Sequence, residues 1–200
     1  MWDERYAADE YVYGTEPNDF LRTAVANVPP GKALCLGEGE GRNAVFLAQQ
    51  GFEVLAVDSS AVGLQKAQRL AEDRGVQIDT LVADLADYAI EPNSWDLITS
   101  IFCHVPPPLR RRLHAGVVAG LRPGGVFILE AYTPAQLEWG TGGPPTAELM
   151  MTRDALVEEL DGLEFEEAVE RERDVLEGQF HTGRGAVVQI LGHKPRQDWG

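Results

Sequence analysis

The sequence of 200 residues lacks any run of about 18 apolar residues, the length that a membrane-spanning helix needs. Its two cysteines, Cys35 and Cys103, are too few for a disulfide-bonded scaffold and fit a reducing compartment. Residues 1–5 lack the basic and apolar regions of a secretory signal. We therefore expect a cytoplasmic protein that does not contact a membrane.

Positive charge is scarce, with 17 Lys and Arg against 32 Asp and Glu and a formal net charge of −15. DNA or RNA would be repelled over most of such a surface, so we expect a small-molecule partner and no nucleic acid. The run Arg110-Arg111-Arg112 is interpreted as the solvated face of a helix. A monomer and a homodimer both remain open.

Recognisable metal-ligand patterns are also missing. The chain has no C-x-x-C or H-x-x-x-H spacing, and the adjacent Cys103 and His104 do not supply a tetrahedral set. No partner in the sequence marks Cys103 as an activated nucleophile. No metal site is predicted.

From residue 31 onward, short apolar runs alternate with helical patterns, which predicts a parallel α/β sheet with helices on both faces. Without repeats or linkers, residues 1–200 are predicted to form one domain with its core at 31–195. The last two strands are predicted to form an antiparallel hairpin. The predicted strands are 33–36, 54–57, 78–82, 95–101, 126–131, 165–176 and 185–192, and the predicted helices begin near Arg42, Ser60, Leu109 and Thr152.

A glycine-rich loop, Gly37-Glu38-Gly39-Glu40-Gly41, follows the first predicted strand. Ligands of open α/β sheets bind outside the carboxyl ends of the strands, where this loop would lie. The dinucleotide fingerprint needs glycine at position 42, where this chain has Arg42. Carboxylates at Glu38 and Glu40 favour a cationic ligand, such as an ammonium or a sulfonium, over a pyrophosphate. A tight turn without a ligand is the alternative.

Two aspartates end the next two predicted strands. Asp58 lies where a carboxylate can accept hydrogen bonds from ribose hydroxyls, and Asp84 lies where it can bind an adenine amino group. Either residue alone also fits a helix cap. With the glycine loop, they place ligand-binding groups at three successive strand ends.

These motifs, at residues 34–43, 57–60, 83–85 and 121–125, resemble the class I S-adenosylmethionine-dependent methyltransferases. Residues 139–144 are similar to the narrower tellurite-resistance and thiopurine-methyltransferase-like branch. The resemblance implies S-adenosyl-L-methionine as the cofactor. It also implies a Rossmann-like seven-stranded sheet of order 3-2-1-4-5-7-6 with strand 7 antiparallel, and an N-terminal lid over residues 1–30 that includes Tyr6.

Carried over by position, the resemblance implies a set of cofactor-binding residues that includes the loop glycines, the ribose and adenine aspartates and two residues near the transferable methyl group. The set is Tyr13, Gly14, Gly37, Glu38, Gly39, Arg42, Asp58, Ser59, Asp84, Leu85, Phe102 and Cys103. Many family members carry an acidic residue where this chain has Cys35. Either Glu38 serves the ammonium group instead, or water makes that contact.

The methyl acceptor is expected to meet residues on the same rim: His104, Tyr132, Trp139, His181 and Arg184. Four of these are catalytic candidates: His104, Tyr132, His181 and Arg184. His104 either acts as a base or bonds a nearby loop carbonyl. His181 and Arg184 either pair with an anionic acceptor or solvate the hairpin turn. Trp139 either walls the acceptor pocket or packs a loop.

The predicted activity is methyl transfer to a small molecule by in-line displacement. A thiol or a chalcogen species of tellurium or selenium needs little beyond alignment, whereas an amine or hydroxyl needs a base. Two alternatives are a non-catalytic S-adenosylmethionine-binding sensor and an NAD-type oxidoreductase. The missing glycine at position 42 and the terminal hairpin disfavour the oxidoreductase.

Overall fold

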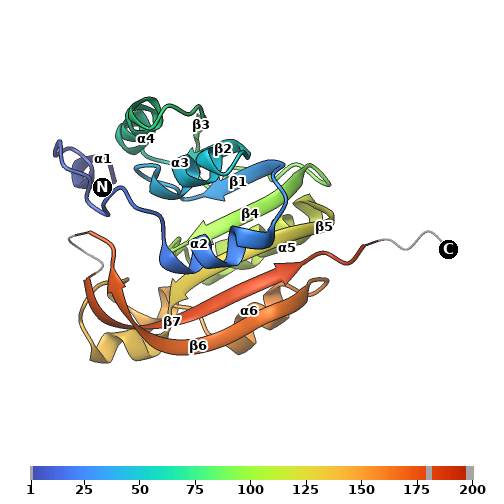
Figure 1. Cartoon of the computed structure of the whole chain (residues 1–200). Coiled ribbons are helices and arrows are strands. Elements are labelled where there is room, and N and C mark those ends of the chain that lie inside the picture. The colour runs from blue at the N-terminus through green and yellow to red at the C-terminus, as the bar shows by residue number, and fades with distance from the viewer. Residues whose placement is uncertain (1, 179–181, 197–200) are drawn as a thin grey trace.

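The computed structural model describes residues 2–178 and 182–196, and one seven-stranded sheet runs through it (Figure 1). The strand order is β3-β2-β1-β4-β5-β7-β6, and β7 runs antiparallel to both neighbours. The predicted order and the antiparallel last strand are confirmed. The strands are β1 (Lys32–Leu36), β2 (Glu53–Asp58), β3 (Asp79–Val82), β4 (Trp95–Ile101), β5 (Leu121–Tyr132), β6 (Glu164–Leu176) and β7 (Thr182–His193).

Helices cover both faces of the sheet. Apolar side chains of α2, α3 and α4 pack on one face, and those of α5 and α6 pack on the other. Because the central strands are buried on both faces, they read as continuous apolar runs rather than alternating ones. The helices are α1 (Trp2–Arg5), α2 (Asp19–Ala24), α3 (Arg42–Gln49), α4 (Ala61–Asp73), α5 (Pro107–Gly120) and α6 (Arg153–Glu159), with short 3-10 turns η1 (Val25–Asn27), η2 (Pro134–Glu138) and η3 (Ala147–Leu149).

The helix boundaries follow from capping residues. The Ser60 hydroxyl accepts a hydrogen bond from the Gly63 amide at the start of α4. At the start of α6, the Thr152 hydroxyl caps the helix in the same way. Helix α5 begins at Pro107, two residues before the predicted Leu109, because proline suits the first helical positions.

Arg110 corrects one expectation, since its side chain on α5 is only 8% exposed and therefore does not belong to a solvated face. It forms an ion pair with Glu159 of α6 at 2.8 Å and donates to the Met150 carbonyl at 3.2 Å. The prediction failed because Arg110 lies three residues before the buried Leu113, on the packed face of α5. Arg110 therefore fastens α6 to α5.

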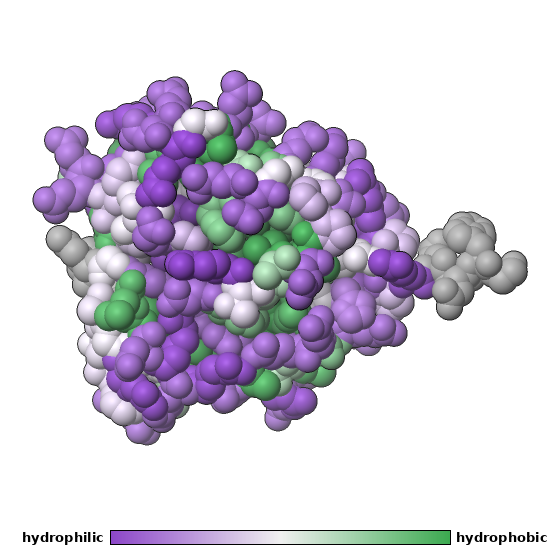
Figure 2. All heavy atoms as spheres, viewed as in Figure 1, coloured by the Kyte–Doolittle hydropathy of each residue, from purple (hydrophilic) through white to green (hydrophobic). Residues whose placement is uncertain are grey.

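The N-terminal segment and the end of β6 lie at the carboxyl ends of the central parallel strands. Figure 1 places α1 and the end of β6 on the side toward which β1 and β4 point. The face drawn in Figure 2 is mostly hydrophilic, with separate small apolar areas. Over residues 2–178 and 182–196, no helix combines the length and apolarity needed to cross a membrane.

Candidate functional site

The loop after β1 requires glycine at two positions. Gly37 and Gly39 have φ angles of 64° and 63°, a left-handed conformation that side-chain-bearing residues rarely adopt. A Cβ atom at Gly37 would lie 2.6 Å from the Cys103 sulfur, and one at Gly39 would lie 2.6 Å from the Tyr6 hydroxyl oxygen. The loop is therefore closely covered from both sides, by the end of β4 and by the N-terminal segment.

Asp58 ties this loop to the end of β2. One carboxylate oxygen accepts from the Gly39 amide at 2.9 Å, and the other accepts from the Ser60 amide at 2.8 Å. Burial raises the pKa of Asp58, although these amides favour the ionised form. Each oxygen retains a second lone pair, so the carboxylate can also accept from ligand hydroxyl groups.

The two loop glutamates have different roles. Glu38 caps α3, since its carboxylate accepts from the Asn43 amide at 3.0 Å and the Ala44 amide at 2.8 Å. Burial raises the pKa of Glu38 to about 7. Glu40 instead pairs with Lys66 at 2.6 Å, so the expected contribution of Glu40 to a cationic ligand is wrong. Glu38 is the loop carboxylate that no lysine or arginine neutralises in an ion pair within the described residues.

The turn after β3 carries the second predicted aspartate. The exposed Asp84 accepts from the Ala86 amide at 2.8 Å, which shapes the turn. The Arg112 guanidinium donates to the Leu85 carbonyl at 2.9 Å and holds the same turn from α5. Leu85 is buried, so this turn presents a fixed backbone and one exposed carboxylate.

Aromatic rings gather at the ends of β4 and β5. The Phe102 and Tyr132 ring centroids lie 4.6 Å apart, and the His104 ring stacks on Tyr132 at 5.9 Å. Phe102 has a φ of 51°, an unusual conformation for a bulky residue and one found most often at functional sites. Burial and the Asp58 charge raise the pKa of Cys103 to about 12, so its thiol is a protonated neighbour of Gly37 rather than a nucleophile.

His104 has both ring nitrogens engaged. Its Nδ1 donates to the Phe102 carbonyl at 3.1 Å, and its Nε2 accepts from the Tyr132 amide at 3.0 Å. Burial lowers the pKa of His104 to about 4, which keeps the ring neutral. With its one ring lone pair already accepting an amide proton, the imidazole has none for a substrate proton. Of the two interpretations, the geometry favours the structural one.

We predict that His104→Ala lowers the free energy of unfolding by about 1–3 kcal/mol, because a buried amide and a carbonyl lose their partner. Turnover is expected to fall less than tenfold. The folded-state pKa of about 4 lies below the unfolded value, so wild-type stability should decrease as pH falls from about 6.5 to about 4. Urea unfolding across this pH range measures the free energy of unfolding, with His193→Ala, at a partly exposed histidine, as the control. A hundredfold loss of turnover at unchanged stability would contradict this assignment.

The remaining acceptor-side candidates are spread along the rim. Arg184 is about half exposed and pairs with Glu172 across the β6–β7 hairpin, as expected for hairpin solvation. Trp139 is 42% exposed beside η2. Arg42, which was expected to bind the cofactor, is buried and pairs with Glu177 just beyond the end of β6. His181 lies outside the described residues.

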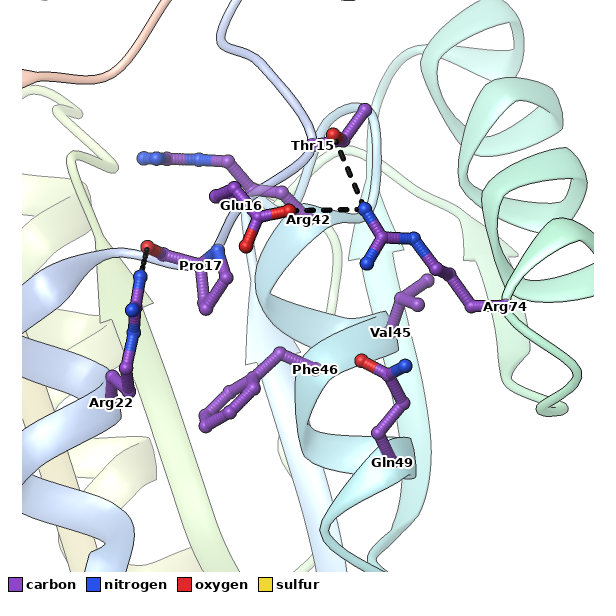
Figure 3. A pocket seen from close by; sticks show the side chains of 9 residues that line it. All are labelled: Thr15, Glu16, Pro17, Arg22, Arg42, Val45, Phe46, Gln49 and Arg74. Atoms are coloured by element: carbon purple, nitrogen blue, oxygen red, sulfur yellow. Dashed lines mark hydrogen bonds and ion pairs between the residues drawn. The ribbon is translucent and has the colours of Figure 1, made fainter.

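A separate small cavity of about 140 Å³ lies between residues 15–17, α2, α3 and the end of α4 (Figure 3). Three arginine side chains line it, but each already has a carboxylate partner. The pairs are Arg22 with Asp19, Arg42 with Glu177, and Arg74 with Glu16. The cavity therefore offers no uncompensated positive charge.

In the described part of the chain, no three His, Cys, Asp or Glu side chains group so that they could hold a metal ion.

The comparison with family models shows what this part of the chain is similar to. Residues 33–125 match the model described as a methyltransferase domain, a segment that includes the glycine loop, Asp58, Asp84 and His104. Residues 33–125 thus resemble a methyltransferase domain, and the sheet around them has the strand order that the class I resemblance implied. The match to a methyltransferase domain implies S-adenosyl-L-methionine as the cofactor.

Individual relatives are distant and have various activities. The chain is 35% identical over 80 residues to the carboxy-S-adenosyl-L-methionine synthase of Trichlorobacter lovleyi, covering 38% of this chain and 33% of that one. It is 31% identical over 137 residues to the tRNA 5-carboxymethoxyuridine methyltransferase of Escherichia coli, covering 60% and 51%. The chain thus spans a third to half of the length of these relatives.

Similarity to solved structures extends over the whole fold. The structure of TehB from Haemophilus influenzae aligns with a TM-score of 0.74 at 18% identity, covering 96% of this chain and 65% of that one. At this identity the similarity concerns the fold alone. The tellurite-related branch therefore stays a prediction.

The residues in and around the glycine loop fit the implied cofactor. A Cβ at Gly37 or Gly39 would clash with Cys103 or Tyr6, so glycine at both positions lets the end of β4 and the N-terminal segment lie close to the loop backbone. The carboxylate of Glu38 forms no ion pair with a lysine or arginine of the described residues, and each oxygen of Asp58 retains a lone pair that can accept from a ligand. Carboxylates suit a ligand that carries a sulfonium and an ammonium.

Proposed function

We propose that this chain transfers a methyl group from S-adenosylmethionine to a small acceptor that arrives as a soft nucleophile, such as a thiolate, a selenide or a telluride. The observation that carries the proposal is the protonation chemistry at the ends of β4 and β5. His104 has both ring nitrogens engaged, and burial raises the pKa of Cys103 and Tyr132. The thiol and the phenol therefore stay protonated at neutral pH and the imidazole lone pair is occupied, so none of the three can take a proton from the acceptor, which is expected to be ionised or soft already.

The residues of the chain would bind and align the reactants. Asp58 would hold the ribose, and the turn at Asp84 and Leu85 would hold the adenine. The loop backbone at Gly37 and Gly39 would accommodate the methionine part. Bound there, the cofactor supplies a methyl group on a cationic sulfur. The aromatic rings of Phe102 and Tyr132 would exclude water beside that methyl group, which favours in-line displacement.

The net charge supports a small acceptor. One relative is a tRNA methyltransferase, but a chain with a net charge of −15 would be repelled by the RNA backbone. The arginine run that could have formed a basic patch is partly buried, since Arg110 pairs with Glu159 and Arg112 binds the Leu85 carbonyl.

A series of thiol acceptors with different pKa values tests this proposal. We expect log kcat/KM to rise with pH through the pKa of each thiol, so that the inflection moves with the acceptor. Amines and alcohols of similar size should give no turnover. An inflection that stays at one pH for all acceptors would show that a base of the enzyme is needed, and would contradict the proposal.

A further inference from the structure

Residues 2–16, which we call the N-terminal strap, contact the domain at several places, and two of these contacts lie close to the glycine loop and Asp58. The first lies at the start of α4, where the Asp3 carboxylate accepts from the Ser60 hydroxyl at 2.5 Å and from the Val62 amide at 3.3 Å. The Ser60 hydroxyl also lowers the pKa of Asp3, as expected for a carboxylate that accepts this bond. This contact fixes the beginning of the strap next to Asp58.

The second fastening uses the buried pair of Glu40 and Lys66. One oxygen of Glu40 accepts from the Val12 amide at 2.8 Å, and the other accepts from the Lys66 ammonium at 2.6 Å. The same ammonium donates to the Glu10 carbonyl at 2.7 Å. The side chains of Glu40 and Lys66 are only 2% and 4% exposed. The pair is thus enclosed and bonds directly to the backbone of residues 10–12.

Tyr6 lies between the two fastenings and covers the loop. Its side chain is buried, and its ring lies against Gly39 and Gly63. The Tyr6 hydroxyl lies 2.6 Å from where a Cβ of Gly39 would be, and the Gly39 amide donates to Asp58. Burial raises the pKa of Tyr6, and the charge of Asp58 raises it further. Tyr13 supports the ring edge-on, with centroids 6.4 Å apart.

We propose that Glu40 and Lys66 are positioning residues for the cofactor: they hold the strap so that Tyr6 covers Asp58 and the glycine loop. This inference rests on the proposed function. Glu40 belongs to the glycine loop itself, and its carboxylate accepts hydrogen bonds from the strap backbone at Val12 and Tyr13. A buried ion pair is seldom more stable than apolar side chains of similar volume, so fold stability alone does not account for it.

The test uses the double variant Glu40→Gln/Lys66→Met in the full chain, which removes the pair without leaving an unpaired buried charge. Hydrogen exchange without cofactor reports on the strap, and stopped-flow measurement gives the dissociation rate of S-adenosylmethionine. We expect protection of the Val12 and Tyr13 amides to fall at least tenfold and cofactor dissociation to accelerate at least tenfold. Arg74→Ala, which removes the exposed contact between α4 and Glu16 of the strap, is the matched control and should change neither.

The outcomes separate the two claims. Unchanged exchange and unchanged dissociation in a folded double variant would overturn the positioning role. Faster exchange with unchanged dissociation would also overturn it, because the strap would then open without affecting the cofactor. If the wild-type chain does not bind S-adenosylmethionine at all, the proposed function fails first, before any substitution is made. If this double variant does not fold, Glu40→Leu/Lys66→Met, which replaces the pair by apolar side chains and also leaves no unpaired buried charge, provides the same comparison.

Discussion

Replacing Asp58 with alanine is expected to weaken S-adenosylmethionine binding by about a hundredfold. Hydrogen bonds to a charged acceptor contribute about 1.5–3 kcal/mol each, so losing bonds to two ribose hydroxyls corresponds to at least about 3 kcal/mol. The change also removes the partner of the Gly39 amide, which loosens the glycine loop. Isothermal titration calorimetry measures the affinity.

Two further variants qualify that result. Asp58→Asn keeps one oxygen acceptor and should lose less affinity than the alanine variant. Asp79→Ala removes an exposed carboxylate from the other end of the neighbouring strand β3 and should leave affinity unchanged. Equal affinities for wild type and Asp58→Ala would remove Asp58 from the site.

The largest expected loss of stability comes from Glu130→Ala. Glu130 is completely buried in β5 and accepts from Asn18 at 2.5 Å, from Arg173 at 2.7 and 2.8 Å, and from Gln189 at 2.6 Å. Removing the carboxylate leaves the largely buried Arg173 guanidinium and the Asn18 amide group with fewer partners, and the Gln189 amide group without its acceptor. We expect the free energy of unfolding to fall by about 3–5 kcal/mol.

Urea unfolding followed by circular dichroism measures this loss. The exposed ion pair of Glu172 and Arg184 on the β6–β7 hairpin provides the control. Glu172→Ala should change the free energy of unfolding by less than about 1 kcal/mol. Glu130→Gln keeps the size and one acceptor and should lie between the two. A Glu130→Ala variant within 1 kcal/mol of wild type would show that the buried network does not contribute to stability.

The strands and the cofactor loop could be predicted because short stretches of sequence are enough to recognise them. Buried parallel strands appear as apolar runs, and Gly37 and Gly39 stand where a Cβ would clash with a neighbouring side chain. The strand order followed from the family resemblance, since local patterns do not say which strands are neighbours. The single-domain boundary at residues 1–200 stays a prediction.

The long-range polar pairs could not be predicted, because their partners lie far apart in the sequence. Lys66 is 26 residues from Glu40, and Asn18 is 112 residues from Glu130. One signal was nevertheless present. Three charged residues stand within the apolar pattern of a strand or helix, and each is buried in an ion pair: Glu130, Lys66 and Arg110. A charge inside an apolar pattern predicts a buried partner without identifying it.

The roles at the rim were the least predictable part. The sequence left His104 open between a base and a structural residue, and the choice depends on the Tyr132 amide, 28 residues away. The resemblance named the N-terminal segment as a lid, but the residues that fasten it, Asp3 and the Glu40–Lys66 pair, emerge from the contacts alone.

Titration of the purified chain with S-adenosylmethionine, with NAD in parallel, tests the central claim most directly. The account predicts micromolar-class binding of S-adenosylmethionine, corresponding to about −8 kcal/mol, and no binding of NAD. Binding of NAD, or of neither compound, would contradict the assignment of the glycine loop to a methyl-donor cofactor.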